Sequence, residues 1–402
     1  MISRYSRFAV LLSGLALLAG CGGGGGGSSN APAAGKVFST YQAADIVIGA
    51  NDMVSLGTTY SANTYGNPAV APNGKLYVPD YGNNTIRVYS NVPSSNGAVE
   101  DFTITTPGTA GPLNGPQTIL FYGGKMLLVD YFNSRVLIWN TPPTANGVAP
   151  DVVVGQATLS GTAAACGPAG LNQPESISVV AGNLVVGDSN NHRVMIYDGI
   201  PAGNGTSAVA VLGQSDFSTC TYNSSNAAQG LKYPTDIAFD GQKMLVLDAE
   251  NNRVLMWNTT DPRTLTTNNP SADIVLGQAN LSSVAINAGQ TAANGFSYPN
   301  FMSLNGGRLA VSDYNNNRVL IWDSVPSCSG AHCAAVFGSP VVIGQTNNSN
   351  SYIWADPPAG TSAGVSPSAK GLSHPAGVVF TSRDQLIVND QGGSRYLVMN
   401  AH

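Results

Sequence analysis

The chain of 402 residues carries 17 basic and 22 acidic side chains, for a formal net charge of -5 at pH 7. Charged residues make up 10% of the chain, and an acidic surface with so few cations would not attract phosphate backbones. The composition therefore argues against nucleic acid as a partner.

Residues 1–20 have the pattern of a secretory signal peptide, because Arg4 and Arg7 precede an apolar stretch and small residues follow it. The apolar stretch is too short to cross a bilayer as a helix. The sequence Leu-Ala-Gly-Cys that ends at Cys21 resembles the bacterial lipobox, which implies that Cys21 becomes the lipidated first residue of the mature protein. The alternative is an ordinary signal peptide with an incidental cysteine.

Residues 21–36 combine the lipidated cysteine with a tether rich in glycine and serine, which holds too few apolar residues to fold. Gly22, rather than aspartate, follows the cysteine. By resemblance to the sorting rule of Gram-negative lipoproteins, this favours the outer membrane, facing either the periplasm or the cell surface. The lipid anchor is the only membrane contact that we expect.

A short motif recurs through most of the remaining chain, as an acid at the end of one apolar run and an arginine five residues later. A sixth copy begins at Asp80, but Thr85 holds the fifth position and the nearest arginine is Arg87. Such a period indicates a repeat architecture. The five regular copies are Asp130 with Arg135, Asp188 with Arg193, Asp248 with Arg253, Asp313 with Arg318, and Asp390 with Arg395.

Each repeat contains four short runs with the composition of β-strands. One run begins after a proline, a second ends at the acid, a third begins at the arginine position, and a fourth closes in Gly-Gln. The runs do not alternate apolar with polar residues, which is typical of sheets covered on both faces. We name the four strands of each unit A, B, C and D in chain order.

The two ends of the repeat region complement each other. Residues 44–49 match the D-type run at residues 272–277, whereas the last unit stops at His402 just after its C strand. An extra D strand at the start and a missing one at the end predict an all-β, six-bladed β-propeller over residues 37–402. Its four-stranded antiparallel blades would be closed by pairing of the N-terminal strand with the C-terminal blade, residues 44–50 with 374–400.

The pattern Leu-x-Val-x-Asp-x-x-Asn-x-Arg-Val-x-x-Trp resembles the NHL repeat, a unit that forms propellers, and it covers nearly all of residues 40–402. The resemblance implies the fold. It does not imply a function, because NHL-like propellers include peptide-amidating lyases, RNA binders, protein-binding modules and many exported bacterial proteins.

The repeated Asp and Arg residues are interpreted as a structural clamp at each blade corner, because residues present in every blade cannot share one active site. The acid would accept loop N–H groups and hold the guanidinium, and the Asn three residues after the acid would adopt a left-handed backbone. The aromatic residues at the end of the C strands are interpreted as packing wedges between blades: Trp139, Trp257, Trp322, Tyr89 and Tyr197.

Four cysteines follow Cys21, and an even number in an exported protein predicts two disulfide bonds. Cys328 and Cys333 lie close in sequence and form the first candidate pair. Cys166 and Cys220 lie in equivalent loops of neighbouring repeats, so a bridge between repeats and two free thiols are both open. A zinc site is the weaker alternative, since no Cys-x-x-Cys pair is present.

Ligand-binding residues are expected where the blades differ. In a propeller, the B–C and D–A loops share one face, and the A strands line the central channel. The residues at the start of the A strands would form a polar ring at the channel mouth, either as a solvated rim or as a pocket for a polar ligand. The candidates are Gln173, Glu175, Tyr233, Asp236, Tyr298, Asn300 and His374, beside Asn67, Gly115 and Gln117.

Two further features add to this prediction. Aromatic and amide residues crowd the B–C loops, including Tyr131 and Phe132, which suits contact with carbohydrate or peptide. The loop from Thr346 to Gly371 is much longer than its counterparts and carries Trp354, so we expect a lid or a contact loop there. The oxygens of Glu175, Asp236 and Asn300 could alternatively hold a calcium ion.

The resulting hypothesis is a lipid-anchored, monomeric propeller outside the cytoplasm that acts as a binding or scaffolding module for a protein, peptide or carbohydrate on its loop face. No cofactor is predicted, and the four histidines lack the spacing of a zinc site. The alternative is a calcium-dependent, lactonase-like hydrolase or lyase with a central-channel site.

Overall fold

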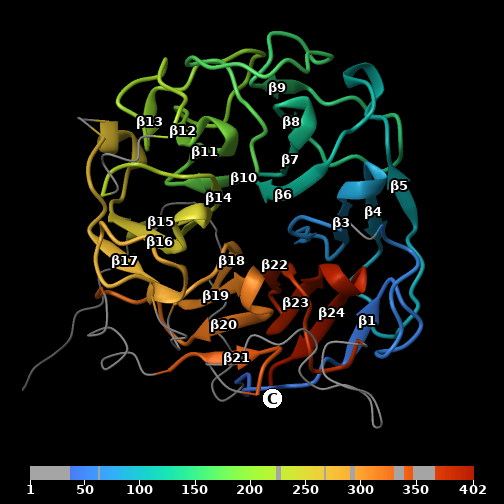
Figure 1. Cartoon of the computed structure of the whole chain (residues 1–402). Coiled ribbons are helices and arrows are strands. Elements are labelled where there is room, and N and C mark those ends of the chain that lie inside the picture. Colours follow the sequence, from blue (N-terminus) through green and yellow to red (C-terminus); the bar gives the residue numbers. More distant parts are fainter. Residues whose placement is uncertain are drawn as a thin grey trace, which may run out of the picture.

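Six four-stranded antiparallel sheets surround a central axis in the computed structural model (Figure 1). The structure describes residues 37–61, 64–222, 228–266, 269–289, 295–329, 339–346 and 367–402. In this described part of the chain, no helix has the length and hydrophobicity needed to span a membrane. The six sheets confirm the predicted propeller.

The strands of each blade run outward from the channel in the order A, B, C, D. Blade 1 contains β2 (Ala69–Val70), β3 (Leu76–Asp80), β4 (Thr85–Tyr89) and β5 (Phe102–Ile104). Blade 2 contains β6 (Pro116–Tyr122), β7 (Lys125–Asp130), β8 (Arg135–Trp139) and β9 (Val152–Val154). Blade 3 contains β10 (Ser176–Val180), β11 (Asn183–Asp188), β12 (Arg193–Ile196) and β13 (Ala210–Leu212).

Blades 4 to 6 repeat this order. Blade 4 contains β14 (Pro234–Phe239), β15 (Lys243–Asp248), β16 (Arg253–Asn258) and β17 (Ile274–Leu276). Blade 5 contains β18 (Pro299–Asn305), β19 (Arg308–Asp313), β20 (Arg318–Trp322) and β21 (Val341–Ile343). Blade 6 contains β22 (Pro375–Phe380), β23 (Gln385–Asp390), β24 (Arg395–Asn400) and β1 (Ile46–Ile48).

The ring closes through the two ends of the propeller, as the strand count predicts. Strand β1 pairs with β24 in antiparallel register, with Ile46 opposite Val398, Val47 opposite Leu397 and Ile48 opposite Tyr396. The blue and red strands therefore lie in one sheet (Figure 1). Because β1 covers the outer edge of β24, that edge is not open to other strands.

The core lies between neighbouring blades. Trp139 belongs to a buried cluster that joins blades 1 and 2, Trp257 to one that joins blades 3 and 4, and Trp322 to one that joins blades 4 and 5. Tyr89 and Tyr197 are buried in the same way. These contacts match the predicted role of the C-strand aromatic residues as wedges.

The repeated acids and arginines pair inside each blade corner. In the five regular copies, the arginine Nε lies 2.7–2.8 Å from the acid Oδ2, and both side chains are at most 2% exposed. The acid Oδ1 accepts the backbone N–H at the end of the preceding D–A loop, as Asp130 does from Asn114 at 2.7 Å. The clamp thus ties the B and C strands to the D–A loop.

Two details of the clamp differ from the sequence-based expectation. The Asn three residues after the acid is not left-handed; instead, its side chain donates to the acid Oδ2, as Asn251 does to Asp248 at 2.9 Å. The left-handed residue is the next one, for example Asn252 with φ of 54°. In blade 1, Arg87 reaches Asp80 at 3.0 Å, because a residue two positions along a strand lies on the same face.

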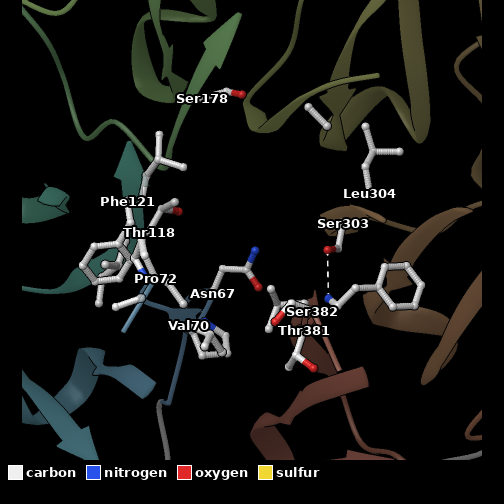
Figure 2. A pocket seen from close by; sticks show the side chains of 18 of the residues that line it. Asn67, Val70, Pro72, Thr118, Phe121, Ser178, Ser303, Leu304, Thr381 and Ser382 are labelled. Atoms are coloured by element: carbon white, nitrogen blue, oxygen red, sulfur yellow. Dashed lines mark hydrogen bonds between the residues drawn. The ribbon is translucent and has the colours of Figure 1, made fainter. Parts of the chain in front are cut away.

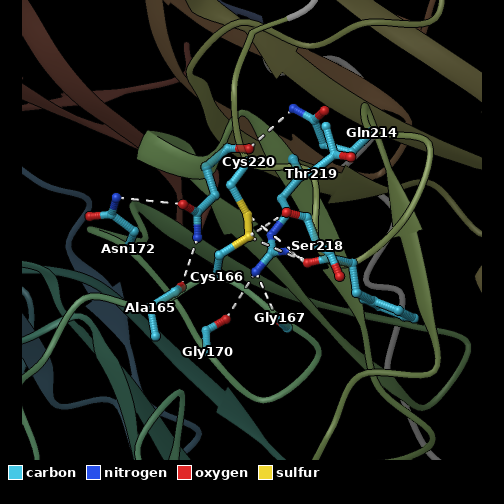
Figure 3. The surroundings of a disulfide bond; sticks show 12 residues. Ala165, Cys166, Gly167, Gly170, Asn172, Gln214, Ser218, Thr219 and Cys220 are labelled. Atoms are coloured by element: carbon cyan, nitrogen blue, oxygen red, sulfur yellow. Dashed lines mark hydrogen bonds between the residues drawn. A yellow bond between two sulfur atoms is a disulfide. The ribbon is translucent and has the colours of Figure 1, made fainter.

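One disulfide joins the loops of two repeats (Figure 3). Cys166 and Cys220 are bonded, with 6.2 Å between their Cα atoms, which decides between the two predicted alternatives. The clamp residue Arg193 donates to Phe217 in one of these loops and to Gly167 in the other. Cys333 lies outside the described residues, so its pairing with Cys328 stays a prediction.

Candidate functional site

The channel mouth is built by the residues that precede the A-strand prolines, and most of them adopt an unusual backbone. Gln173, Tyr233, Tyr298 and His374 all have positive φ, between 46° and 57°. A left-handed conformation costs a non-glycine residue on the order of 1–3 kcal/mol. The surrounding structure must therefore hold these four residues in place.

Hydrogen bonds between neighbouring blades supply this support. The N–H of each of these residues donates to the side chain of the left-handed B–C loop residue in the preceding blade, at 2.9–3.2 Å. Tyr298, for example, donates to Asn252 Oδ1, and His374 donates to Asn317 Oδ1. The B–C and D–A loops therefore share one face, as predicted.

Tyrosine side chains from several blades fill the channel just inside this mouth. The hydroxyl groups of Tyr131 and Tyr233 lie 2.7 Å apart, although they come from blades 2 and 4. Tyr65 donates to Asn300 Oδ1 at 2.7 Å and so links blade 1 to blade 5. We call Tyr65, Tyr131, Glu175, Tyr233 and Asn300 the axial plug.

Glu175 is the acid of the axial plug and is only 2% exposed. Burial raises the pKa of its carboxyl group to about 8; hydrogen bonds from Tyr233 and Gln117 oppose the rise, and the nearby Asp236 adds to it. Within the described part of the chain, Glu175 Oε2, Gln117 Oε1 and Asn300 Nδ2 are buried and have no hydrogen-bond partner. A buried polar atom that lacks a partner costs about 1–3 kcal/mol.

The side-chain oxygens of Asp236 and Asn300, which are predicted calcium ligands, already accept hydrogen bonds. Asp236 accepts the backbone N–H groups of Ile237 and Met302, both at 2.8 Å, and burial raises its pKa to about 7. The unpartnered atom of Asn300 is a donor rather than an oxygen ligand. Among the described residues, no group of three or more His, Cys, Asp or Glu side chains could hold a metal ion. A calcium ion here would compete with two backbone N–H groups for the oxygens of Asp236.

Partly exposed aromatic residues surround the plug on the face of the B–C and D–A loops. Ring centroids lie 5.4 Å apart for Tyr81 and Phe132, and 6.1 Å and 5.0 Å apart along the series Tyr298, Tyr314 and His374. Phe132 is the most exposed of these residues, at 44%. We call the set the aromatic rim. It consists of Tyr81, Phe132, Tyr298, Tyr314 and His374.

A cavity of about 880 Å³ occupies the other end of the channel (Figure 2). Its inner end is lined by Asn67, Thr118 and Asp236, next to the plug, and its outer end by the A–B turns of blades 1 and 6. In Figure 2, Thr118, Ser178 and Leu304 lie around the open space from three different blades. We expected a pocket at the mouth formed by the B–C and D–A loops, whereas this cavity lies on the opposite side of the plug.

Only some of the predicted ligand-binding residues lie close together in the structure. Glu175, Tyr233 and Asn300 meet in the plug, and Tyr298 and His374 lie in the rim. Gln173 accepts a hydrogen bond from Asn190, and Asp236 links two neighbouring A strands. Trp354 lies outside the described residues. The sequence reasoning missed Tyr65, because it precedes the A strand and belongs to no repeated motif.

Comparisons with known proteins agree with this architecture. Residues 171–197, which run from before β10 to the residue after β12, match the family model of the NHL repeat. Among curated proteins no match was found. The chain is therefore a six-bladed β-propeller that contains an NHL repeat.

Solved structures are similar to this chain at low sequence identity. A protein of unknown function from Bacteroides thetaiotaomicron is 10% identical, with a TM-score of 0.51, over 89% of this chain and 75% of that one. An auxiliary nutrient binding protein from the same organism is 12% identical, with a TM-score of 0.48, over 84% and 68% of the chains. Virginiamycin B lyase from Staphylococcus aureus is 10% identical, with a TM-score of 0.44, over 86% and 97%. At these identities the likeness concerns the fold alone.

Proposed function

We propose that this protein is a binding module that captures a partner on its aromatic rim and is held outside the cytoplasm by a lipid on Cys21. The observation that supports the rim as the binding surface is the concentration of stiff aromatic side chains on one face, at loop positions where the blades differ in sequence. Such side chains lose little conformational freedom on binding and carry polar tips.

A carbohydrate suits the rim better than a peptide or a protein does. The rim offers ring faces next to amide side chains, because Tyr314 donates to Gln391 at 2.6 Å and Gln173 pairs with Asn190 nearby. Sugar rings present both C–H faces and hydroxyl groups, so they match aromatic rings flanked by amides. A peptide or protein partner would use the same surface.

The test compares two exposed aromatic residues at opposite ends of the channel. Phe132 is 44% exposed on the rim, and Tyr122 is 43% exposed at the A–B turn of blade 2. We expect Phe132→Ala to weaken binding to a polysaccharide microarray at least tenfold, as for a central aromatic contact worth about 1.4 kcal/mol or more. Tyr122→Ala should leave binding unchanged.

Peptide arrays, probed in parallel, distinguish the partner classes. Equal losses for both variants would show that general surface hydrophobicity, rather than the rim, retains the partner. The lipid anchor is tested separately by mass spectrometry of the mature N-terminus, where a diacylglycerol on Cys21 is expected. An unmodified Cys21 would leave rim binding intact and remove the anchor from the proposal.

The alternative function is a calcium-dependent, lactonase-like hydrolase or lyase that uses the axial plug. Glu175 favours it, since a buried carboxyl with a pKa of about 8 can donate a proton near neutral pH. Elemental analysis of protein purified without chelator tests this alternative. One calcium per chain, lost in the double variant Glu175→Ala with Asp236→Ala, would favour the enzyme over the binding module.

A further inference from the structure

The cavity at the A–B end of the channel has a layered lining that the proposed function does not use. One half-buried residue from each blade forms a belt around it: Val70, Leu120, Ser178, Ala238, Leu304 and Val379. All of these except Ser178 are apolar. A volume of about 880 Å³ lies within the range of pockets that enclose small organic molecules.

The two charged residues of the lining lie at opposite ends of the cavity. Asp236 lies at the inner end, where its oxygens accept two backbone N–H groups. Arg383 lies at the outer end, in the exposed turn between β22 and β23. A negative group on a ligand would therefore be attracted to the outer end, where the guanidinium of Arg383 carries a positive charge.

Arg383 differs from the other basic residues in the described part of the chain. Its guanidinium has no ion pair, hydrogen bond or aromatic contact there, whereas the basic residues near the other A–B turns are engaged. Lys75 pairs with Asp101, Lys243 with Asp240 and Arg308 with Asp323. The planar donor fork of Arg383 is thus available at the cavity entrance, and such a fork matches a carboxylate.

We propose that this cavity binds an amphipathic organic carboxylate, with its apolar body in the belt and its carboxylate on Arg383. This site is separate from the aromatic rim, because the axial plug lies between them. A small molecule held here would occupy the channel while the rim contacts a larger partner on the opposite face.

A displacement assay on the full mature protein tests the site. The probe is 8-anilinonaphthalene-1-sulfonate, whose fluorescence rises in apolar surroundings, and the competitors are decanoate and its neutral counterpart decanol. We expect decanoate to displace the probe. Arg383→Ala should weaken decanoate about tenfold or more, which corresponds to the loss of one charge-assisted hydrogen bond, and should leave decanol unchanged.

Two further variants locate the effect. Ser178→Phe introduces a large side chain into the belt and should abolish displacement by both competitors. Lys125→Ala removes a basic residue of another A–B turn, which does not line the cavity, and should change neither affinity. The proposal is overturned if the probe does not bind, if decanoate binds Arg383→Ala as tightly as the parent protein, or if Ser178→Phe leaves binding intact.

Discussion

The buried residue Glu175 in the axial plug makes the free energy of unfolding depend on pH. The pKa of Glu175 is about 8 in the folded protein, compared with about 4.3 for an exposed glutamate. Between these two values, the unfolded chain ionises at this residue and the folded protein keeps its proton. Folding stability therefore falls as pH rises through this window, by up to about 1.4 kcal/mol per pH unit.

This sign gives a direct prediction for Glu175→Gln, which removes the titration and keeps the shape of the side chain. We expect the variant to gain stability relative to the parent protein as pH rises from 5 to 8, by a few kcal/mol in total. Urea unfolding at several pH values measures the difference. Asp236, with a pKa of about 7, titrates in both proteins, and its charge adds to the pKa rise of Glu175, so the measured difference includes the coupling between the two groups.

The matched control is Glu250→Gln, at a surface glutamate whose side chain is 37% exposed and pairs with Lys232. It reports the effect of the same chemical change at an exposed position outside the axial plug. A difference between Glu175→Gln and the parent protein that does not vary with pH would contradict the assignment of a buried, protonated Glu175.

Contacts between single residues across the channel are the part of the site that the sequence does not predict. The clamp acids and arginines recur five times, so their shared role could be inferred from recurrence alone. Tyr65 belongs to no repeated motif, and Tyr131 holds a motif position that Tyr81 and Tyr314 share. Their contacts with Asn300 and Tyr233 join residues 235 and 102 positions apart. No periodicity reports such contacts, because they depend on which blades face each other across the channel.

At the scale of the element, the corner clamp explains why each blade repeats the same few polar residues. In blade 4, Asp248 holds Arg253, accepts the N–H of Lys232 at 2.6 Å and accepts from Asn251 at 2.9 Å. Arg253 also donates to the carbonyl groups of Leu281 and Gly230. One buried ion pair thus orders the B–C turn and both flanking loops.

The clamp of blade 1 is less buried than that of blade 4, so the two clamps can be compared by removing the acid from each. We expect Asp248→Ala to destabilise the protein by about 3–5 kcal/mol, because the buried Arg253 would lose its counter-ion. Asp80→Ala should cost less than half as much. Its partner Arg87 is 15% exposed and keeps a second ion pair with Glu100 at 2.5 Å. Thermal unfolding of both variants measures the difference, and equal losses would argue against the role of burial.

The elements themselves were predictable, with exceptions that have physical reasons. Short apolar runs bounded by proline and glycine located the strands, since both signals are local. The sequence predicts the left-handed residue one position too early, at the Asn three residues after the acid. That Asn instead satisfies the acid, and the true left-handed position holds Asn, Ser or His, so no single residue type marks it.

At the scale of the whole molecule, closure decides every assignment of a residue to a face. The strand count predicts that residues 44–50 pair with the last blade, and the pairing of β1 with β24 confirms this. The disulfide between Cys166 and Cys220 links loops 54 residues apart in sequence and joins neighbouring blades on the same ring. The cavity at the A–B end could not be inferred, because the sequence does not report how six A strands fill a shared channel.

The most direct test of this account is a cysteine cross-link across the closing pair of strands. Ile46 and Val398 are register partners, and paired Cα atoms in an antiparallel sheet lie about 4.5–5.5 Å apart, within disulfide range. We predict that Ile46→Cys with Val398→Cys forms an intramolecular disulfide, identified by peptide mass spectrometry. Ile46→Cys with Leu397→Cys, on the opposite face of the sheet, should not. Absence of the first bond, or equal formation of both, would contradict the closed ring.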